Sequence, residues 1–203
     1  MYLVTGGFGF IGIHLVRELC ARGEQVRVFD CGAPHNDDRI EGVEYITGDI
    51  RDETLVRKSC ANVERIFHII ALVPIAKAGR RYWDVNVTGT RYLLDAALEH
   101  QVKKVVYVSS SAVYDLDQQN PITEQSRIQP VGKYGRSKLA AEEVCLQYRD
   151  KGVDVTIIRP RTVVGRQRLG IFQILFDWIS RRKHIYIIGK GLNSVRVVTA
   201  GDW

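Results

Sequence analysis

The amino-acid sequence predicts an α/β fold with a doubly wound parallel sheet. Short apolar runs rich in β-branched residues recur along the chain, and each is bounded by glycine or polar residues, as buried strands are. Longer segments with helical spacing lie between several of these runs, and strands that alternate with helices indicate a parallel sheet covered on both faces. The length of 203 residues, 45% of them hydrophobic, suits one domain or one and a fraction, at roughly 150 residues per domain.

The expected strands are Tyr2 to Thr5, Val26 to Phe29, Val43 to Thr47, Arg65 to Ile70, Lys104 to Ser109 and Val153 to Ile158. The clearest helical stripes are Ile11, Leu15 and Leu19, closed by Gly23, and Val87, Leu93, Leu94, Ala97 and Leu98. Right-handed crossovers between parallel strands place ligands at the carboxyl ends of the strands, near the switch in strand order. We therefore expect the functional residues to follow the strands.

Composition and charge exclude several classes of protein. The formal charge of +6 comes from 29 basic and 23 acidic residues, and the basic residues are scattered, so we expect no nucleic-acid partner. The longest apolar stretch, Ile66 to Ala76, is far shorter than the ~20 residues that a bilayer needs, and no membrane association is expected. The first residues leave no room for a signal peptide, which predicts a cytoplasmic protein. No metal site and only reduced thiols are expected, because metal-ligand spacing is lacking at Cys20, Cys31, Cys60 and Cys145.

The first expected strand runs directly into a glycine-rich turn and then into a helix. Gly6 suits the tight turn, Gly9 the close approach of a pyrophosphate, and Gly12 the close packing of the helix. The helix N-terminus adds N–H donors and the positive end of a dipole. Glycines match such a pattern by chance in ordinary loops, but this position after the first strand predicts a Rossmann-type cofactor site. Its residues are Gly6, Gly7, Phe8, Gly9, Phe10, Ile11 and Gly12.

Asp30 ends the second expected strand, at a distance from the glycine turn that suits an acid bound to the adenosine ribose hydroxyls. Its carboxylate would repel a 2′-phosphate, and no basic residue stands in the segment Cys31 to Ala33. These residues favour NAD over NADP as the cofactor. The alternative is an aspartate that merely ends a strand.

Tyr134 and Lys138 have the spacing YxxxK, which places both side chains on one face of a helix. A nearby ammonium lowers the pKa of a phenol and makes it a proton donor and acceptor near neutrality. Chance alone yields such pairs, and Tyr186 with Lys190 is a second copy. That copy begins in Ile185 to Ile188, an apolar run that we expect to be a strand ending at Gly189, where four residues span roughly 13 Å. Only Tyr134 opens a helical segment, so we assign the catalytic pair to Tyr134 and Lys138.

The glycine turn, Asp30 and the YxxxK pair together resemble the extended branch of the short-chain dehydrogenase/reductase family, which includes NAD-dependent epimerases and dehydratases of nucleotide sugars. Further segments agree in the same order. Gly48 to Asp52 resembles the adenine-contacting loop, His68 to Ala71 the strand end that lines the cofactor, and Asn86 to Thr90 the central helix. The resemblance extends from Met1 to about Gly165 and implies NAD contacts from Asp49, Ile50, Ala71, Tyr134 and Lys138.

The same resemblance implies a catalytic hydroxyl three residues before the Val of a Val-Tyr pair. Counted back from Val113, this residue is Ser110, and Ser111 beside it is implied as a substrate contact. Dehydratases of the family carry an acidic pair after this hydroxyl, and nucleotide-sugar decarboxylases carry a Glu at the second position. Ser111 and Ala112 follow here. The sequence therefore favours epimerisation or simple alcohol oxidation.

Residues 1–160 are expected to form the NAD-binding domain that carries Ser110, Tyr134 and Lys138, and residues 161–203 the start of a smaller, incomplete substrate-binding part. Family members continue well beyond Trp203, which makes a fragment or a short form the expectation. The polar connection Asp115 to Pro130 is expected to be a lid or a surface excursion.

The expected function is that of a NAD-dependent nucleotide-sugar epimerase that works by transient hydride transfer. Arg196 lies in a segment that loosely resembles a diphosphate contact of the family, and further arginines able to pair a diphosphate are Arg161, Arg166 and Arg168. One alternative is a hydroxysteroid-type alcohol dehydrogenase, with an apolar pocket to which Ile171, Phe172, Leu175 and Phe176 contribute. Another is a non-catalytic NAD-binding regulatory protein. A homodimer is left open.

Overall fold

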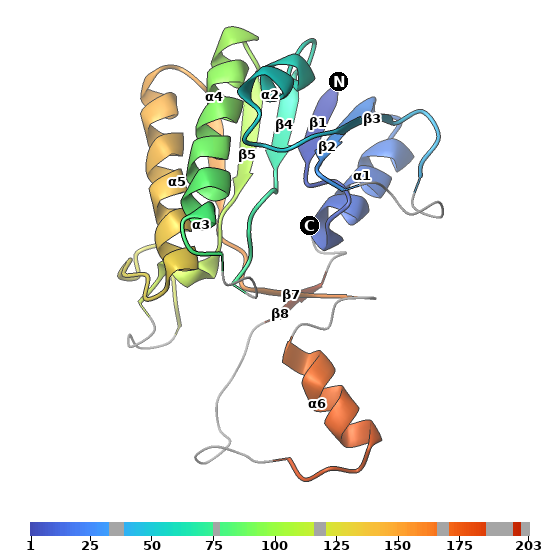
Figure 1. Ribbon diagram of the computed structural model, residues 1–203, viewed down its shortest axis with the longest axis vertical. Coiled ribbons are helices and arrows are strands. Elements are labelled where there is room, and N and C mark those ends of the chain that lie inside the picture. Colours follow the sequence, from blue (N-terminus) through green and yellow to red (C-terminus); the bar gives the residue numbers. More distant parts are fainter. Residues whose placement is uncertain (33–38, 75–77, 116–120, 166–170, 186–196, 200–203) are drawn as a thin grey trace. The chain divides into compact units, whose positions relative to one another are not determined.

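The computed structural model describes residues 1–32, 39–74, 78–115, 121–165, 171–185 and 197–199, without the side chains of 171–173 (Figure 1). The chain divides into two compact units, Met1–Arg159 and Pro160–Trp203. The first unit is a parallel α/β sheet with helices on both faces, which confirms the predicted fold class. The second unit contains the parallel pair β7 (Thr162–Val164) and β8 (Val197–Thr199) and the helix α6 (Ile171–Ser180).

The sheet of the first unit has the strand order β3-β2-β1-β4-β5-β6, with all described pairs parallel. Its strands are β1 (Tyr2–Thr5), β2 (Val26–Asp30), β3 (Glu44–Thr47), β4 (Arg65–His68), β5 (Lys104–Val108) and β6 (Val155–Ile158). The direction of winding reverses between β1 and β4. Ligands of such sheets bind outside the carboxyl ends of the strands at this switch point.

The helical elements of the first unit are α1 (Phe10–Ala21), α2 (Glu53–Ser59), α3 (Arg81–Trp83), the π-helical segment η2 (Asp84–Thr88), α4 (Gly89–Glu99), the 3₁₀ turn η3 (Ser111–Val113) and α5 (Lys133–Asp150). The core lies on both faces of the sheet, because neighbouring residues of a strand point to opposite faces. Leu3 packs with Leu93 of α4 and Ala141 of α5, whereas Val4 packs with Val16 of α1.

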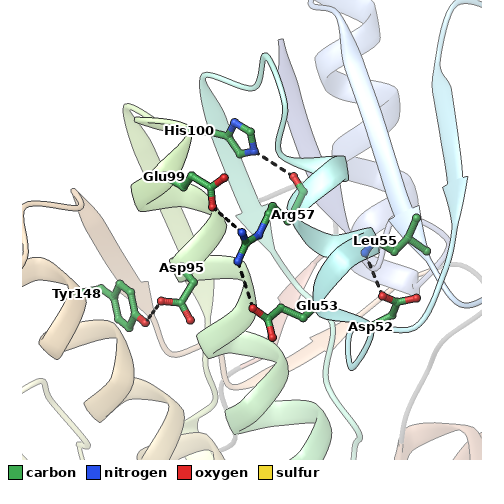
Figure 2. Close-up of polar contacts among 8 residues, drawn as sticks. All are labelled: Asp52, Glu53, Leu55, Arg57, Asp95, Glu99, His100 and Tyr148. Carbon is green, nitrogen blue, oxygen red and sulfur yellow. Dashed lines mark hydrogen bonds and ion pairs between the residues drawn. The ribbon is translucent and has the colours of Figure 1, made fainter.

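Polar contacts join α2, α4 and α5 along their outer surfaces (Figure 2). Arg57 of α2 pairs with Glu53 one turn earlier at 3.2 Å and with Glu99 of α4 at 3.3 Å. The hydroxyl of Tyr148 on α5 donates a hydrogen bond to Asp95 of α4. Exposed ion pairs contribute little stability, so the buried apolar residues beneath these contacts hold the helices together.

Two strands end earlier than their apolar patterns suggest. β4 ends at His68 rather than Ile70, and β5 ends at Val108 rather than Ser109. In both cases the N–H of the next residue still bonds to the neighbouring strand, Ile69 to Thr5 of β1 at 3.2 Å and Ser109 to Ile158 of β6 at 2.8 Å. Strand β6 begins at Val155, because the N–H of Val153 is bonded to Tyr148 at the end of α5 instead of to the sheet.

Among the described residues no helix combines the length and the apolar character needed to cross a bilayer. Cys20, Cys31, Cys60 and Cys145 are free thiols in the structure. The described part of the chain also holds no group of histidine, cysteine and carboxylate side chains arranged to bind a metal ion.

Candidate active site

The glycine turn lies between β1 and α1, at the switch point of the sheet. Gly6 has a φ of +76°, a backbone conformation that glycine adopts at little cost. A Cβ at Gly12 would overlap the carbonyl oxygen of Gly6 and lie 2.7 Å from the Cα of Gly7. Helix α1, capped by Gly9, therefore starts directly against the turn and directs the positive end of its dipole there. This geometry fits a pyrophosphate.

The carboxylate of Asp30 is held in place by two backbone groups. Its Oδ2 accepts a hydrogen bond from the N–H of Phe8 in the glycine turn at 3.1 Å, and its Oδ1 accepts one from the N–H of Gly32 at 3.1 Å. The aromatic ring of Phe8 stacks on Tyr45 of β3. Asp30 therefore lies beside the turn, where an acid can reach the ribose of a dinucleotide.

The structure places Asp49 and Ile50 after β3, at the same carboxyl edge, but with different surroundings. Asp49 pairs with Arg51, whose hydrogen bonds lower the pKa of the Asp49 carboxyl below its usual value. The side chain of Ile50 is buried against Gly89 of α4, where an added Cβ would lie 2.8 Å from it. Ala71 follows β4 and is half-buried. Their roles as cofactor contacts remain predictions.

The side chain of Asn86 in η2 connects two distant segments by hydrogen bonds, and the sequence did not single it out as an individual residue. Its Oδ1 accepts the N–H of Leu72 at 2.8 Å, and its Nδ2 donates to the hydroxyl of Ser137 at 2.9 Å. The Ser137 hydroxyl in turn donates to the carbonyl of Tyr134 at 2.8 Å. The loop after β4 is thereby tied to the first turn of α5. The sequence signal was a polar residue between Val85 and Val87, but its partners are far away in the chain.

Tyr134 and Lys138 lie in the first turns of α5, as the helical pattern predicted. Lys138 is buried, and its ammonium donates a hydrogen bond to the carbonyl of Val108 at 2.7 Å and lies 4.3 Å from the ring centroid of Tyr107. Burial lowers the pKa of Lys138 to about 7. Tyr134 is half-buried and contacts the ring of Tyr82 edge-to-face.

Ser110 caps the turn η3, where its hydroxyl accepts the N–H of Ala112 at 3.2 Å. This turn packs directly on the start of α5. A Cβ at Gly135 would overlap the carbonyl oxygen of Ala112 and lie 2.9 Å from the Cβ of Pro130. The glycine that follows Tyr134 thus permits the segment of Ser110 and Ser111 to approach the helix of Tyr134 and Lys138.

His68 is buried at the end of β4 in a directed chain of hydrogen bonds. The Thr90 hydroxyl donates to the carbonyl of Asn86 at 2.7 Å and therefore accepts from His68 Nε2 at 3.0 Å. His68 Nδ1 then accepts from the Thr5 hydroxyl at 2.7 Å. This assigns the Nε2–H tautomer of a neutral imidazole. Burial, with a smaller effect of the Lys138 charge, lowers the pKa of His68 to about 3.

The neutral His68 makes stability depend on pH. Between pH 6.5 and about 3 the unfolded chain binds a proton that the folded chain does not, so the free energy of unfolding falls as the pH falls through this window. At 1.36 kcal/mol per pKa unit the loss approaches about 5 kcal/mol near pH 3, and about half of it falls between pH 7 and pH 4.5. Urea unfolding of the wild type and of His68→Asn at pH 7 and pH 4.5 measures it. We expect a weaker pH dependence in the variant, and equal dependence in both proteins would contradict the assignment.

The second unit holds the remaining predicted residues. Arg161 is exposed, whereas Arg166, Arg168 and Arg196, the second YxxxK pair of Tyr186 and Lys190, and Trp203 lie outside the described residues. In α6 the side chain of Leu175 is half-buried and that of Phe176 is exposed, while the side chains of Ile171 and Phe172 are not among those described. An arginine cluster and an apolar pocket therefore stay predictions.

The family model described as the NAD dependent epimerase/dehydratase family matches residues 2–202. The chain belongs to this family. Its model covers both units, and it confirms the family expected from the glycine turn and the YxxxK pair. The cofactor of the family is NAD, in agreement with the fit of a pyrophosphate to the turn at Gly12.

Several relatives are similar over much of the chain. An uncharacterized protein, y4nG, of Sinorhizobium fredii is 40% identical over 98% of this chain and 50% of its own length. Sterol demethylase protein B of Methylococcus capsulatus is 37% identical over 80% of this chain and 51% of its own. A putative UDP-glucose 4-epimerase of Methanocaldococcus jannaschii is 31% identical over 100% of this chain and 70% of its own. The chain thus spans about half the length of the first two relatives.

A solved structure of a UDP-sugar epimerase is similar to this chain in fold. The UDP-glucuronic acid 4-epimerase of Bacillus cereus, solved in complex with NAD, is 26% identical and superposes with a TM-score of 0.87 over 99% of this chain and 70% of its own. The Rossmann-like fold and the cofactor of the neighbour agree with the first unit as described above.

Proposed function

We propose that this protein is a NAD-dependent nucleotide-sugar epimerase. The observation that carries the proposal is the arrangement at the start of α5, where Tyr134 precedes a buried Lys138 by one helical turn and Gly135 admits the turn of Ser110. These groups lie at the same edge of the sheet as the glycine turn. The similarity to a putative UDP-glucose 4-epimerase and a UDP-glucuronic acid 4-epimerase supports the choice of substrate class.

The glycine turn and Asp30 would hold NAD, with the pyrophosphate at the start of α1 and the adenosine ribose at the Asp30 carboxylate. When bound, NAD supplies the chemistry of hydride acceptance from a carbinol carbon and of its return. The protein binds and orients both partners of this exchange.

Tyr134 is the proton acceptor for the substrate hydroxyl. As a phenolate it removes the hydroxyl proton while the carbinol carbon gives up its hydride, which leaves a ketone, and it returns that proton when the ketone is reduced on its other face. The ammonium of Lys138 favours the phenolate by its charge. Ser110 donates a hydrogen bond to the developing carbonyl oxygen. Ser111 and Ala112, and not an acidic pair, directly follow Ser110, in keeping with epimerisation rather than dehydration.

The function is tested by incubating the purified protein with UDP-, dTDP- and GDP-sugars and by recording product stereochemistry together with the absorbance of NADH. An epimerase inverts one carbinol centre without net production of NADH. NADH in proportion to product, with no inverted sugar, overturns the proposal. Binding of NAD with no turnover of any substrate favours a regulatory NAD-binding protein.

A second candidate is an alcohol dehydrogenase that acts on a sterol-like substrate. It is favoured by the 37% identity to sterol demethylase protein B. The same Ser110, Tyr134 and Lys138 would serve that reaction, and the substrate pocket would be apolar instead of lined with arginines. A 3-hydroxysterol added to the same assay separates the two functions, because oxidation of the sterol accumulates NADH.

Cofactor preference tests the role of Asp30. Its carboxylate is fixed beside the glycine turn, so a 2′-phosphate at that position meets a negative charge. We expect NAD to bind at least about tenfold more tightly than NADP, a difference of about 1.4 kcal/mol. In Asp30→Asn, which removes the charge and keeps one acceptor oxygen, this preference shrinks. Titration of both proteins with both nucleotides measures it, and equal dissociation constants in the wild type would reject the role.

A further inference from the structure

An ion pair between a buried glutamate and a partly exposed arginine lies beside the predicted catalytic serine, Ser110. Glu142 of α5 is 3% exposed, and both of its carboxylate oxygens are occupied by the guanidinium of Arg159, which follows β6. Arg159 Nε donates to Oε1 at 3.0 Å and Nη2 donates to Oε2 at 2.7 Å. Parallel bonds of this kind fix the relative orientation of both side chains. Neither residue belongs to the glycine turn or to the YxxxK pair.

The ion pair contacts the chain on both sides of Ser110. The hydroxyl of Ser109 donates a hydrogen bond to Glu142 Oε1. The Nη1 of Arg159 donates to the hydroxyl of Tyr114 at 3.0 Å, and the guanidinium lies 5.1 Å from the centroid of the Tyr114 ring. The segment Ser109–Tyr114 is therefore held at its first and last residues by one pair of charges.

The same ion pair is anchored to the helix of the YxxxK motif. Glu142 follows Lys138 by four residues and Tyr134 by eight, so the three side chains lie along one face of α5. A third contact between the segment and this helix is the close approach of Ala112 to Gly135. Displacement of Glu142 would free the ends of the serine segment. Because the Glu142 charge raises the pKa of Lys138, Glu142→Gln also changes that lysine, whereas Ser109→Ala changes the segment and leaves both charges in place.

We propose that Glu142 and Arg159 are positioning residues, whose ion pair holds the segment Ser109–Tyr114 against α5. The Ser110 hydroxyl and the Tyr134 phenol can then form hydrogen bonds to the same substrate oxygen. The proposal rests on the epimerase function proposed above for its effect on turnover. A small displacement of an oriented hydroxyl lowers the rate of the chemical step far more than it lowers binding. In this proposal the ion pair acts on kcat through Ser110, and neither of its residues is among the predicted NAD contacts.

The test compares Glu142→Gln, Ser109→Ala and the double variant with Asp154→Asn. Glutamine keeps the size of Glu142 but loses the charge, and alanine removes only the hydroxyl that reaches Glu142. The control breaks the ion pair between Asp154 and Lys104, 2.8 Å apart at the opposite ends of the same two strands. Each folded variant is measured for kcat, KM, the NAD dissociation constant and amide hydrogen exchange of residues 109–114. If Glu142→Gln does not fold, Ser109→Ala, which leaves the ion pair intact, carries the test.

We expect Glu142→Gln to lower kcat about tenfold or more, with KM and NAD binding changed less than about threefold. Amide hydrogen exchange in residues 109–114 becomes faster in Glu142→Gln and in Ser109→Ala and stays unchanged in Asp154→Asn. The double variant loses no more activity than Glu142→Gln alone, because the Ser109 hydroxyl acts through the same carboxylate. Unchanged kcat per folded molecule, or effects that multiply in the double variant, would overturn the proposal.

Failure of the epimerase function gives a different result. If the wild type binds NAD but turns over no nucleotide sugar, the proposed function fails. Hydrogen exchange alone then tests the positioning role of Glu142 and Arg159. Faster exchange of residues 109–114 in Glu142→Gln and Ser109→Ala, with none in Asp154→Asn, supports the positioning role. Exchange equal to that of the wild type in both variants rejects it.

Discussion

Replacing Tyr134 with phenylalanine is expected to lower kcat by about a thousandfold or more and to change the NAD dissociation constant less than about threefold. The substitution removes one oxygen from a half-buried side chain and keeps the ring that contacts Tyr82. The proposed reaction then lacks the group that accepts and returns the proton of the substrate hydroxyl. We expect cofactor binding to depend mainly on the glycine turn and Asp30, which the substitution does not touch.

Tyr148→Phe is the matched control for this variant. Tyr148 lies near the C-terminal end of the same helix, α5, and its hydroxyl donates to Asp95 of α4. Loss of that hydrogen bond lowers the free energy of unfolding by about 1 kcal/mol and leaves kcat near the wild-type value. Steady-state rates with the substrate found in the sugar assay, combined with NAD titrations, give both numbers. Near-normal turnover by Tyr134→Phe would remove Tyr134 from the mechanism.

The parts of the structure that the sequence predicts are those set by local pattern. Strand β1 has the predicted bounds Tyr2–Thr5, because a glycine follows its apolar run directly. Helix α5 contains Tyr134 and Lys138, as its apolar spacing indicated. The six-stranded parallel sheet follows from the alternation of such elements and from the rule of right-handed crossovers.

The contacts that organise the candidate site depend on packing between distant segments, and a single sequence does not specify them. Asn86 donates a hydrogen bond to Ser137, which lies 51 positions later in the chain. Asn86 belongs to a π-helical segment, and the wider turn of a π-helix leaves no recognisable hydrophobic pattern in the sequence. Glu142 meets Arg159 only because α5 packs beside the carboxyl end of β6. The local signal at Glu142 is the first of two adjacent carboxylates, Glu142 and Glu143, between small and apolar residues and four positions after Lys138.

Replacing Gly12 with alanine is expected to weaken NAD binding about a hundredfold or more and to lower the free energy of unfolding by about 2 kcal/mol. The new methyl group would overlap the carbonyl oxygen of Gly6 and lie 2.8 Å from its carbonyl carbon. These are backbone atoms of the turn itself, so no side-chain rotation relieves the overlap. Either α1 moves away from β1 or the turn opens, and both movements take the helix N-terminus away from the pyrophosphate position.

Alanine at two further glycines should have smaller effects on NAD binding, in proportion to the space around each. Alanine at Gly7 would meet the Val28 side chain at 2.5 Å, which can move in part, and we expect a smaller loss of NAD affinity. Gly132 caps α5, and an added Cβ there has no heavy atom within 4 Å, so Gly132→Ala should bind NAD like the wild type. Calorimetric titration with NAD and urea unfolding of the three variants measure the order. Equal NAD affinity of Gly12→Ala and Gly132→Ala would show that the cofactor does not bind at the start of α1.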